Sequence, residues 1–271
     1  MNETFNFKRF WTYFKYDLKQ MWRNHSKAAI LIGGSAVIVY VIWVLMSLVF
    51  TQSWSSPMIG VRLGIFLLAF AILEFYQTRT YGYITDRKAG SSWLMIPASK
   101  AEKFVSMLII TLLVIPLLFM LVFFSTDSLL SLVDPTYGQA LIAGFSDKLF
   151  DFIGDLSSDE SPIVFTAGNM AFPMIVGFFC NFLYFLLCGV CFRRNKIMWS
   201  IAIMLGVSIL LSVLTGLGLI PAMKNMDTVD FSEEQIIRWT VGFMNAMVVL
   251  ECLLTVGLGW GVYRRIKTIQ Q

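Results

Sequence analysis

Glu251 is the residue whose chemistry is hardest to explain as simple packing. It lies near the middle of the apolar run 239–263, where an unpaired carboxylate in hydrocarbon is costly. Such a group faces the interior of a helix bundle, and two interpretations compete. It binds a substrate or a coupling proton, or it stays protonated and bonds to a neighbouring helix. The sequence leaves both open and makes Glu251 the intramembrane polar candidate.

A second acidic group is the stripe Asp147, Asp151 and Asp155, spaced by four residues along a predicted amphipathic helix over 144–157. Hard divalent cations bind carboxylates, but the stripe lacks the turn-forming loop and varied ligands of a dedicated calcium site. Stripes of this kind usually form the solvated face of a helix. We therefore expect no metal site here, and the role of this acidic helix stays open.

Few residues in the sequence are suited to enzymatic catalysis. His25 is the only histidine, so a zinc site with two histidines is impossible. Cys188 and Cys191 have CxxC spacing, but redox or metal chemistry needs a partner pair or a thioredoxin-like context that the sequence lacks. No Gly-Lys pair occurs, so there is no P-loop. We expect no enzymatic activity and no cofactor; any ATP must be bound by another chain.

These residues belong to an apolar chain of 271 residues, which is 57% hydrophobic and has a mean hydropathy of +0.72. Six apolar runs of about 20–25 residues are each long enough to cross a hydrocarbon core of about 30 Å as a helix. They lie at about 28–50, 57–77, 104–126, 169–192, 197–220 and 239–263. The sequence predicts an all-α integral membrane protein, a single transmembrane domain over 1–271 with six transmembrane helices.

The positions of the positive charges indicate how the chain is oriented in the membrane. Most of the 21 Lys and Arg residues lie in 1–27, in 78–103, in 193–196 and after Tyr263. The positive-inside rule therefore places both termini in the cytoplasm. Because the chain has no soluble basic module, these charges complement anionic membrane lipid, and no nucleic acid partner is expected. Arg62, near the outer end of its run, is expected to snorkel to lipid headgroups.

Residues 7–25 form a helix of a different kind, which precedes the first run. Aromatic and aliphatic residues recur there every three or four positions, with cations between them. This is the profile of an amphipathic helix that lies in the membrane interface.

The cytoplasmic gap 78–103 is longer than a tight connection needs. It contains the apolar stretch 93–97, too short to cross a membrane, followed by Ser99-Lys100-Ala101-Glu102. A serine followed three residues later by a glutamate is the capping-box pattern, so the third helix is expected to begin near Ser99. The gap therefore predicts a structured piece with a role of its own. The exterior loop is the segment 127–168.

These parts resemble a known family, the permease subunits of ABC transporters of the exporter-like type-two class. The resemblance rests on the aromatic and basic helix 7–23 and on the segment 93–104, which is similar to a run in a bacterial, Bacteroidetes-like branch of that class. It implies a bacterial cytoplasmic (inner) membrane protein that works with a separate ABC ATPase subunit and a second permease copy or paralogue. The ATPase would dock on a coupling-like loop, with these partner-coupling residues: Arg87, Lys88, Trp93, Leu94, Met95, Ile96 and Pro97.

One feature departs from that family, and other functions stay open. The class commonly places its larger exterior elaboration between the fifth and sixth spans, whereas here it lies between the third and fourth. The alternatives are a self-sufficient secondary transporter, in which Glu251 couples a proton, and a non-transporting membrane assembly or sensing protein. Neither the substrate nor the direction of transport follows from the sequence.

Overall fold

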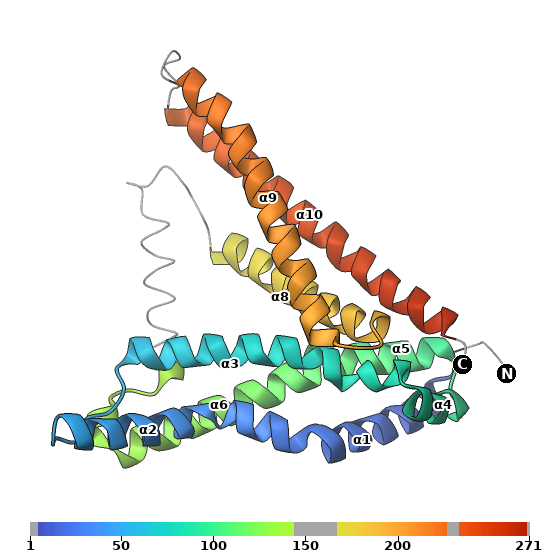
Figure 1. The fold of residues 1–271 in the computed structure, drawn as a ribbon, viewed down its shortest axis with the longest axis horizontal. Helices are drawn as coiled ribbons and strands as arrows, with labels where there is room; N and C mark the ends of the chain where they lie inside the picture. The colour runs from blue at the N-terminus through green and yellow to red at the C-terminus, as the bar shows by residue number, and fades with distance from the viewer. Residues whose placement is uncertain (1–4, 144–166, 227–232, 270–271) are drawn as a thin grey trace.

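The computed structural model describes residues 5–143, 167–226 and 233–269, and every regular element within them is a helix. The acidic helix expected over 144–157 lies outside the described residues. Figure 1 shows a flat body, made by the helices up to residue 133, from which the last three helices rise obliquely.

The N-terminal segment is one long, bent helix pair. α1 (Phe7–Gly33) begins at Asn6, whose side chain accepts hydrogen bonds from the backbone N–H groups of Lys8 and Arg9. It continues without a break through the boundary expected near residue 25, and α2 (Ser35–Phe50) follows after a bend of 42° at Gly34. At Gly33 a β-carbon would lie 2.9 Å from Val122, so glycine allows α1 to approach the facing helix closely there. The expected amphipathic helix is therefore part of a longer element that packs along the body.

The next segment crosses the body and forms a small structure at its end. α3 (Ile59–Thr80) is followed by the short η1 (Gly82–Thr85) and by α4 (Arg87–Met95). α5 (Lys100–Ile109) then begins with the predicted capping box: Ser99 Oγ accepts from Glu102 N at 3.2 Å, and Glu102 Oε2 accepts from Ser99 N at 2.8 Å.

A π-helical turn joins α5 to the helix that crosses back. η2 (Ile110–Val114) leads into α6 (Ile115–Val133), with Pro116 at the start of α6. Proline has no N–H and its ring collides with the carbonyl four residues earlier, so a locally widened turn accommodates it without ending the helix. The short η3 (Pro135–Tyr137) follows α6.

The last three helices are α8 (Ala167–Cys191), α9 (Lys196–Met226) and α10 (Glu233–Thr268). α8 packs against both α3 and α10, so it links the flat body to the oblique hairpin of α9 and α10 (Figure 1). At Gly189 a β-carbon would lie 2.6 Å from Thr78 O, which only glycine avoids at this crossing of α3 and α8. The start of α1, α4 and the end of α10 lie at one end of the molecule, named the α4 end below.

All six predicted runs fall in helices, but fewer helices have the length and composition of a membrane span. Three qualify among the described residues: Ile59–Thr85, Lys100–Val133 and Asn245–Thr268. The bent pair of α1 and α2 makes four if it is one span, and Ile175–Cys191 and Lys196–Leu210 are shorter apolar helices. The chain is thus all-helical in its described part, with three to four candidate membrane-spanning helices.

Candidate functional site

The α4 end contains the segment expected to couple to a partner. It is attached to the body through Glu102, a fully buried carboxylate at the start of α5. Arg9 of α1 donates to both oxygens, from Nε at 2.8 and 3.0 Å and from Nη2 at 2.7 Å, and Asn6 N donates at 2.8 Å. One carboxylate therefore completes the capping box of α5 and also holds the first turn of α1. A bidentate arginine–carboxylate pair of this kind is strong and directional.

Trp93 provides the second attachment. It is 2% exposed, and its indole N–H donates to Tyr13 Oη of α1 at 3.1 Å. Lys103 Nζ donates to the Trp93 carbonyl oxygen at 2.8 Å and lies 4.6 Å from the centre of the Trp93 ring. The C-terminal turn of α4 is thus held between α1 and α5.

The remaining residues of the segment differ in exposure. Met95 is 82% exposed and Pro97 is exposed, whereas Leu94 and Ile96 are half-buried. Trp93 is thus a supporting residue of the segment, and Met95 and Pro97 form its accessible surface. The side chains of Arg87 and Lys88 lie outside the described residues.

A groove runs beside this accessible surface. Its volume is about 490 Å³, and it separates the first three turns of α1 from the residues that follow α4. The described residues that line it are Asn6, Lys8, Arg9, Thr12, Tyr13, Tyr16, Ile96, Pro97 and Ala98. Exposed apolar side chains next to a groove with a basic edge are suited to binding another protein.

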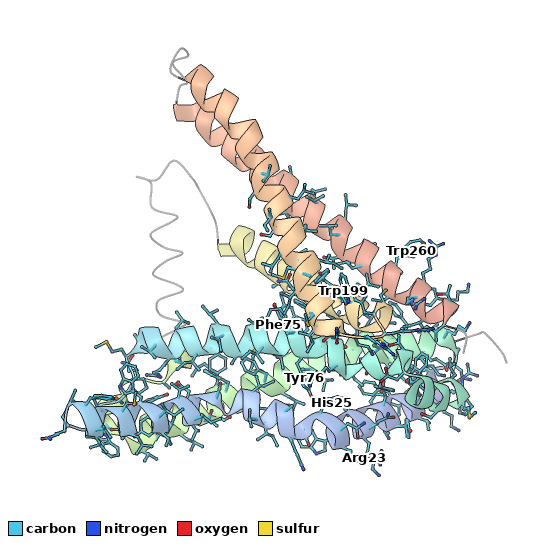
Figure 2. All side chains as sticks on the ribbon, in the orientation of Figure 1. Arg23, His25, Phe75, Tyr76, Trp199 and Trp260 are labelled. Atoms are coloured by element: carbon cyan, nitrogen blue, oxygen red, sulfur yellow. The ribbon has the colours of Figure 1, made fainter. Side chains whose placement is uncertain are left out.

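Asp17 joins three helices below this surface and was not recognised in the sequence. It is 3% exposed, and its Oδ2 accepts from Tyr81 Oη at 3.0 Å and from Ser106 Oγ at 2.7 Å. Nearby, His25 Nδ1 lies 2.7 Å from Tyr76 Oη, and Figure 2 shows these two side chains between α1 and α3. Polar contacts therefore connect α1 to α3 and α5 along its length.

Glu251 is half-buried on α10. Its carboxyl faces α8, because a β-carbon built on Gly177 would lie 4.0 Å from Glu251 Oε2. The neighbouring Thr255 donates its hydroxyl to the Glu251 backbone carbonyl at 2.7 Å. Glu74 of α3 bonds to Asn181 of α8. Two carboxyl groups, one on α10 and one on α3, thus face α8.

The opposite end contains a buried ion pair in place of the expected snorkelling arginine. Arg62 is 3% exposed and Asp127 1%. Arg62 Nη2 donates to both Asp127 oxygens at 2.8 and 2.9 Å, and its Nε donates at 3.1 Å. Tyr137 Oη donates to Asp127 at 2.9 Å, and its ring lies 4.0 Å from the guanidinium carbon. The expectation for Arg62 was wrong because a buried partner at the end of α6 neutralises its charge.

Asp134 completes this end of the body. Its carboxylate accepts hydrogen bonds from Tyr40 at 2.7 Å, from Trp54 at 3.1 Å and from the hydroxyl of Thr136 at 2.7 Å. Burial opposes its ionisation, but the hydrogen bonds from Thr136, Tyr40 and Trp54 outweigh that effect and lower the pKa of Asp134 to about 2. The carboxylate therefore stays charged across the physiological range and ties α2 to the α6–η3 turn.

The described residues offer an accessible surface at the α4 end and two half-buried carboxyl groups, Glu74 and Glu251, on apolar helices. Within 5–143, 167–226 and 233–269 no cluster of three or more His, Cys, Asp or Glu side chains could hold a metal ion. Compared with known proteins, the chain matches no protein-family model, no curated protein and no solved structure. The function must therefore be argued from the chain itself.

Proposed function

We propose that this chain is the membrane permease subunit of an ATP-driven ABC transporter. It would have six spans with both termini in the cytoplasm, and it would move a substrate across the bacterial cytoplasmic membrane together with a separate ATPase subunit. The single observation that supports this most is the construction of the α4 end. The short helix α4 is held by Trp93, next to the Arg9–Glu102 pair that joins α1 to α5, and it exposes Met95 beside a groove with a basic edge.

Bracing matters because a coupling element must transmit movement. A loop attached only at its two ends would absorb a push from an ATPase by bending. Here hydrogen bonds join Trp93 of α4 to Tyr13 of α1 and to Lys103 of α5, and the Arg9–Glu102 ion pair joins α1 to α5 beside them, so a force on Met95 would be passed to those helices. Such transmission needs packed elements with defined contacts.

The exposed apolar surfaces of α9 and α10 also support the proposal that the chain has a partner within the membrane. α9 exposes apolar side chains between residues 203 and 213, and α10 exposes others between 247 and 260. Lipid or a second permease copy would cover them, because a hydrophobic face of this size is not stable in water. A dimer of permease chains is part of the proposal.

The test compares two exposed methionines at opposite ends of the body. The tagged chain is purified from its native membranes, and the co-purified nucleotide-binding subunit and vanadate-sensitive ATP hydrolysis are measured. Met95→Glu should lower both by about 30-fold, as expected for a central apolar contact worth about 2 kcal/mol. Met58→Glu changes a methionine that is 76% exposed at the opposite end and should leave both unchanged. A native preparation without any ATP-hydrolysing subunit would count against the proposal.

A secondary transporter is the second candidate, and Glu251 is the observation that favours it. Its carboxyl lies midway along α10 against α8, where a transported proton or substrate could bind. In that case transport would follow an imposed proton gradient without ATP, and Glu251→Gln would abolish it. An ATP-driven permease would instead transport in the absence of a gradient.

A further inference from the structure

A second cavity at the α4 end has a distinctive composition. Its volume is about 340 Å³, and it lies between the end of α4, the start of α5 and the end of α10. The residues that line it are Trp93, Leu94, Ala98, Ser99, Lys100, Ala101, Lys103, Tyr263, Ile266 and Lys267. Three of these are lysines, and none of the described lining residues is acidic. The described lining of the cavity therefore concentrates positive charge.

The bonds that the structure gives for two of these lysines end on neutral carbonyl oxygens. Lys103 is 4% exposed, and its ammonium donates to the carbonyl oxygens of Trp93 at 2.8 Å and Leu94 at 3.5 Å. Lys100 Nζ donates to the Lys267 carbonyl oxygen at 2.9 Å. Glu102, the nearest carboxylate in sequence, accepts from Arg9 and thus serves a different contact.

A buried ammonium group is costly unless an opposite charge accompanies it. Carbonyl oxygens and a tryptophan ring satisfy the hydrogen-bond geometry of Lys103, but they carry no net charge. The three ion pairs among the described residues join Arg9 to Glu102, Arg62 to Asp127 and Lys196 to Asp86. None involves a lysine of this cavity, so within the described part of the chain these ammonium groups have no carboxylate partner, and the site is suited to an anionic ligand.

We propose that this cavity binds a phosphate-bearing anion. The phosphate would accept from Lys100, Lys103 and Lys267, which act as separate point charges around it. The first turn of α5 lines the cavity as well. It lies where apolar helices end in basic residues, the level at which anionic lipid headgroups gather. The ligand is thus an anionic phospholipid headgroup or a soluble phosphate compound.

The experiment uses the full chain and separates the two sources. The protein is placed in phosphatidylcholine nanodiscs with or without phosphatidylglycerol. Native mass spectrometry then counts the phosphatidylglycerol molecules that stay bound when the protein is released from the nanodiscs. In detergent without anionic lipid, inorganic phosphate is titrated and the shift in apparent Tm is measured. The variant is Lys100→Gln with Lys267→Gln, because both lysines lie near the surface and Lys103, which packs against Trp93, is left intact. The control is Lys15→Gln with Lys19→Gln, which removes two exposed lysines of α1 away from the cavity.

For a lipid ligand, the cavity variant should lower phosphatidylglycerol affinity by about 30-fold, since each lysine near a lipid surface contributes about fivefold. The control should retain the lipid. For a soluble ligand, inorganic phosphate should raise the apparent Tm of the native chain and of the control but not of the cavity variant. Either result supports the site. The proposal would be overturned if the cavity variant and the control lost bound lipid or the phosphate response equally, or if the native chain responded to neither probe.

Discussion

Removing the charge of Asp127 is expected to destabilise the protein far more than removing an exposed carboxylate. Asp127→Asn keeps the shape of the side chain but leaves the Arg62 guanidinium at 3% exposure without its anion. Three hydrogen bonds to a carboxylate are weakened or lost, while the carbonyl oxygens of Tyr137 and Gln139 still accept at 3.0 Å. Breaking a buried pair from one side costs about 3–5 kcal/mol.

Thermal unfolding of the purified chain in detergent measures this effect. At about 2–4 °C per kcal/mol for a chain of this size, the apparent Tm should fall by at least about 6 °C. The control is Asp86→Asn, because the Lys196–Asp86 pair spans 3.4 Å and Asp86 is 55% exposed. An exposed pair of this kind contributes less than about 1 kcal/mol.

A double-mutant cycle shows whether the pair itself carries the energy. Arg62→Met, Asp127→Asn and the double variant are compared, and the coupling should be about 1–3 kcal/mol, since the second change removes a charge that the first left unpaired. An Asp127→Asn protein within about 2 °C of the native Tm, or effects that simply add, would refute this reasoning.

Three further changes have defined outcomes. Gly189→Val should greatly reduce the yield of folded protein in fluorescence size-exclusion chromatography, because the added β-carbon would lie 2.6 Å from Thr78 O. Gly64→Ala should not reduce the yield, because nothing lies within 4 Å of the carbon that it adds. Ser99→Ala removes the N-cap of α5 and should cost about 1 kcal/mol, which a Tm comparison detects; an unchanged Tm would contradict the role of the capping box. The pKa of Asp134 in the folded protein, about 2, lies below its ordinary value, so its contribution to stability is present above about pH 4 and is lost as the pH falls toward 2. Asp134→Asn should therefore flatten the decline of apparent Tm between about pH 5 and 3, and an unchanged slope would show that this carboxylate does not contribute.

The features that the sequence predicted correctly are local ones. Each of the six apolar runs falls in a helix, and Ser99 and Glu102 form the expected capping box. Both follow from contacts within a few residues, since hydrophobic periodicity and N-cap hydrogen bonds are set by neighbours along the chain. The segment 78–103 likewise folds into elements of its own, η1 and α4.

The contacts that brace the candidate site were not predictable in this way. Arg9 and Glu102 are separated by 93 positions, and Arg62 and Asp127 by 65. Each of these charges is consistent with an exposed side chain when read alone. A signal for the second pair did exist, because an arginine inside an apolar run requires a counter-charge and Asp127 directly follows the next run. Choosing among several carboxylates, however, requires the packing of the helices.

Composition and periodicity determined that this chain is helical and apolar enough for a membrane, because those properties are sums over neighbouring residues. Tertiary structure decided which polar groups are used and for what. It placed Trp93 in the core and Met95 on the surface although they are two residues apart, because α4 turns one side toward α1 and α5 and the other away. It also gathered Lys100, Lys103 and Lys267 around one cavity, since only the packing of α10 against the start of α5 brings residues so distant in sequence together.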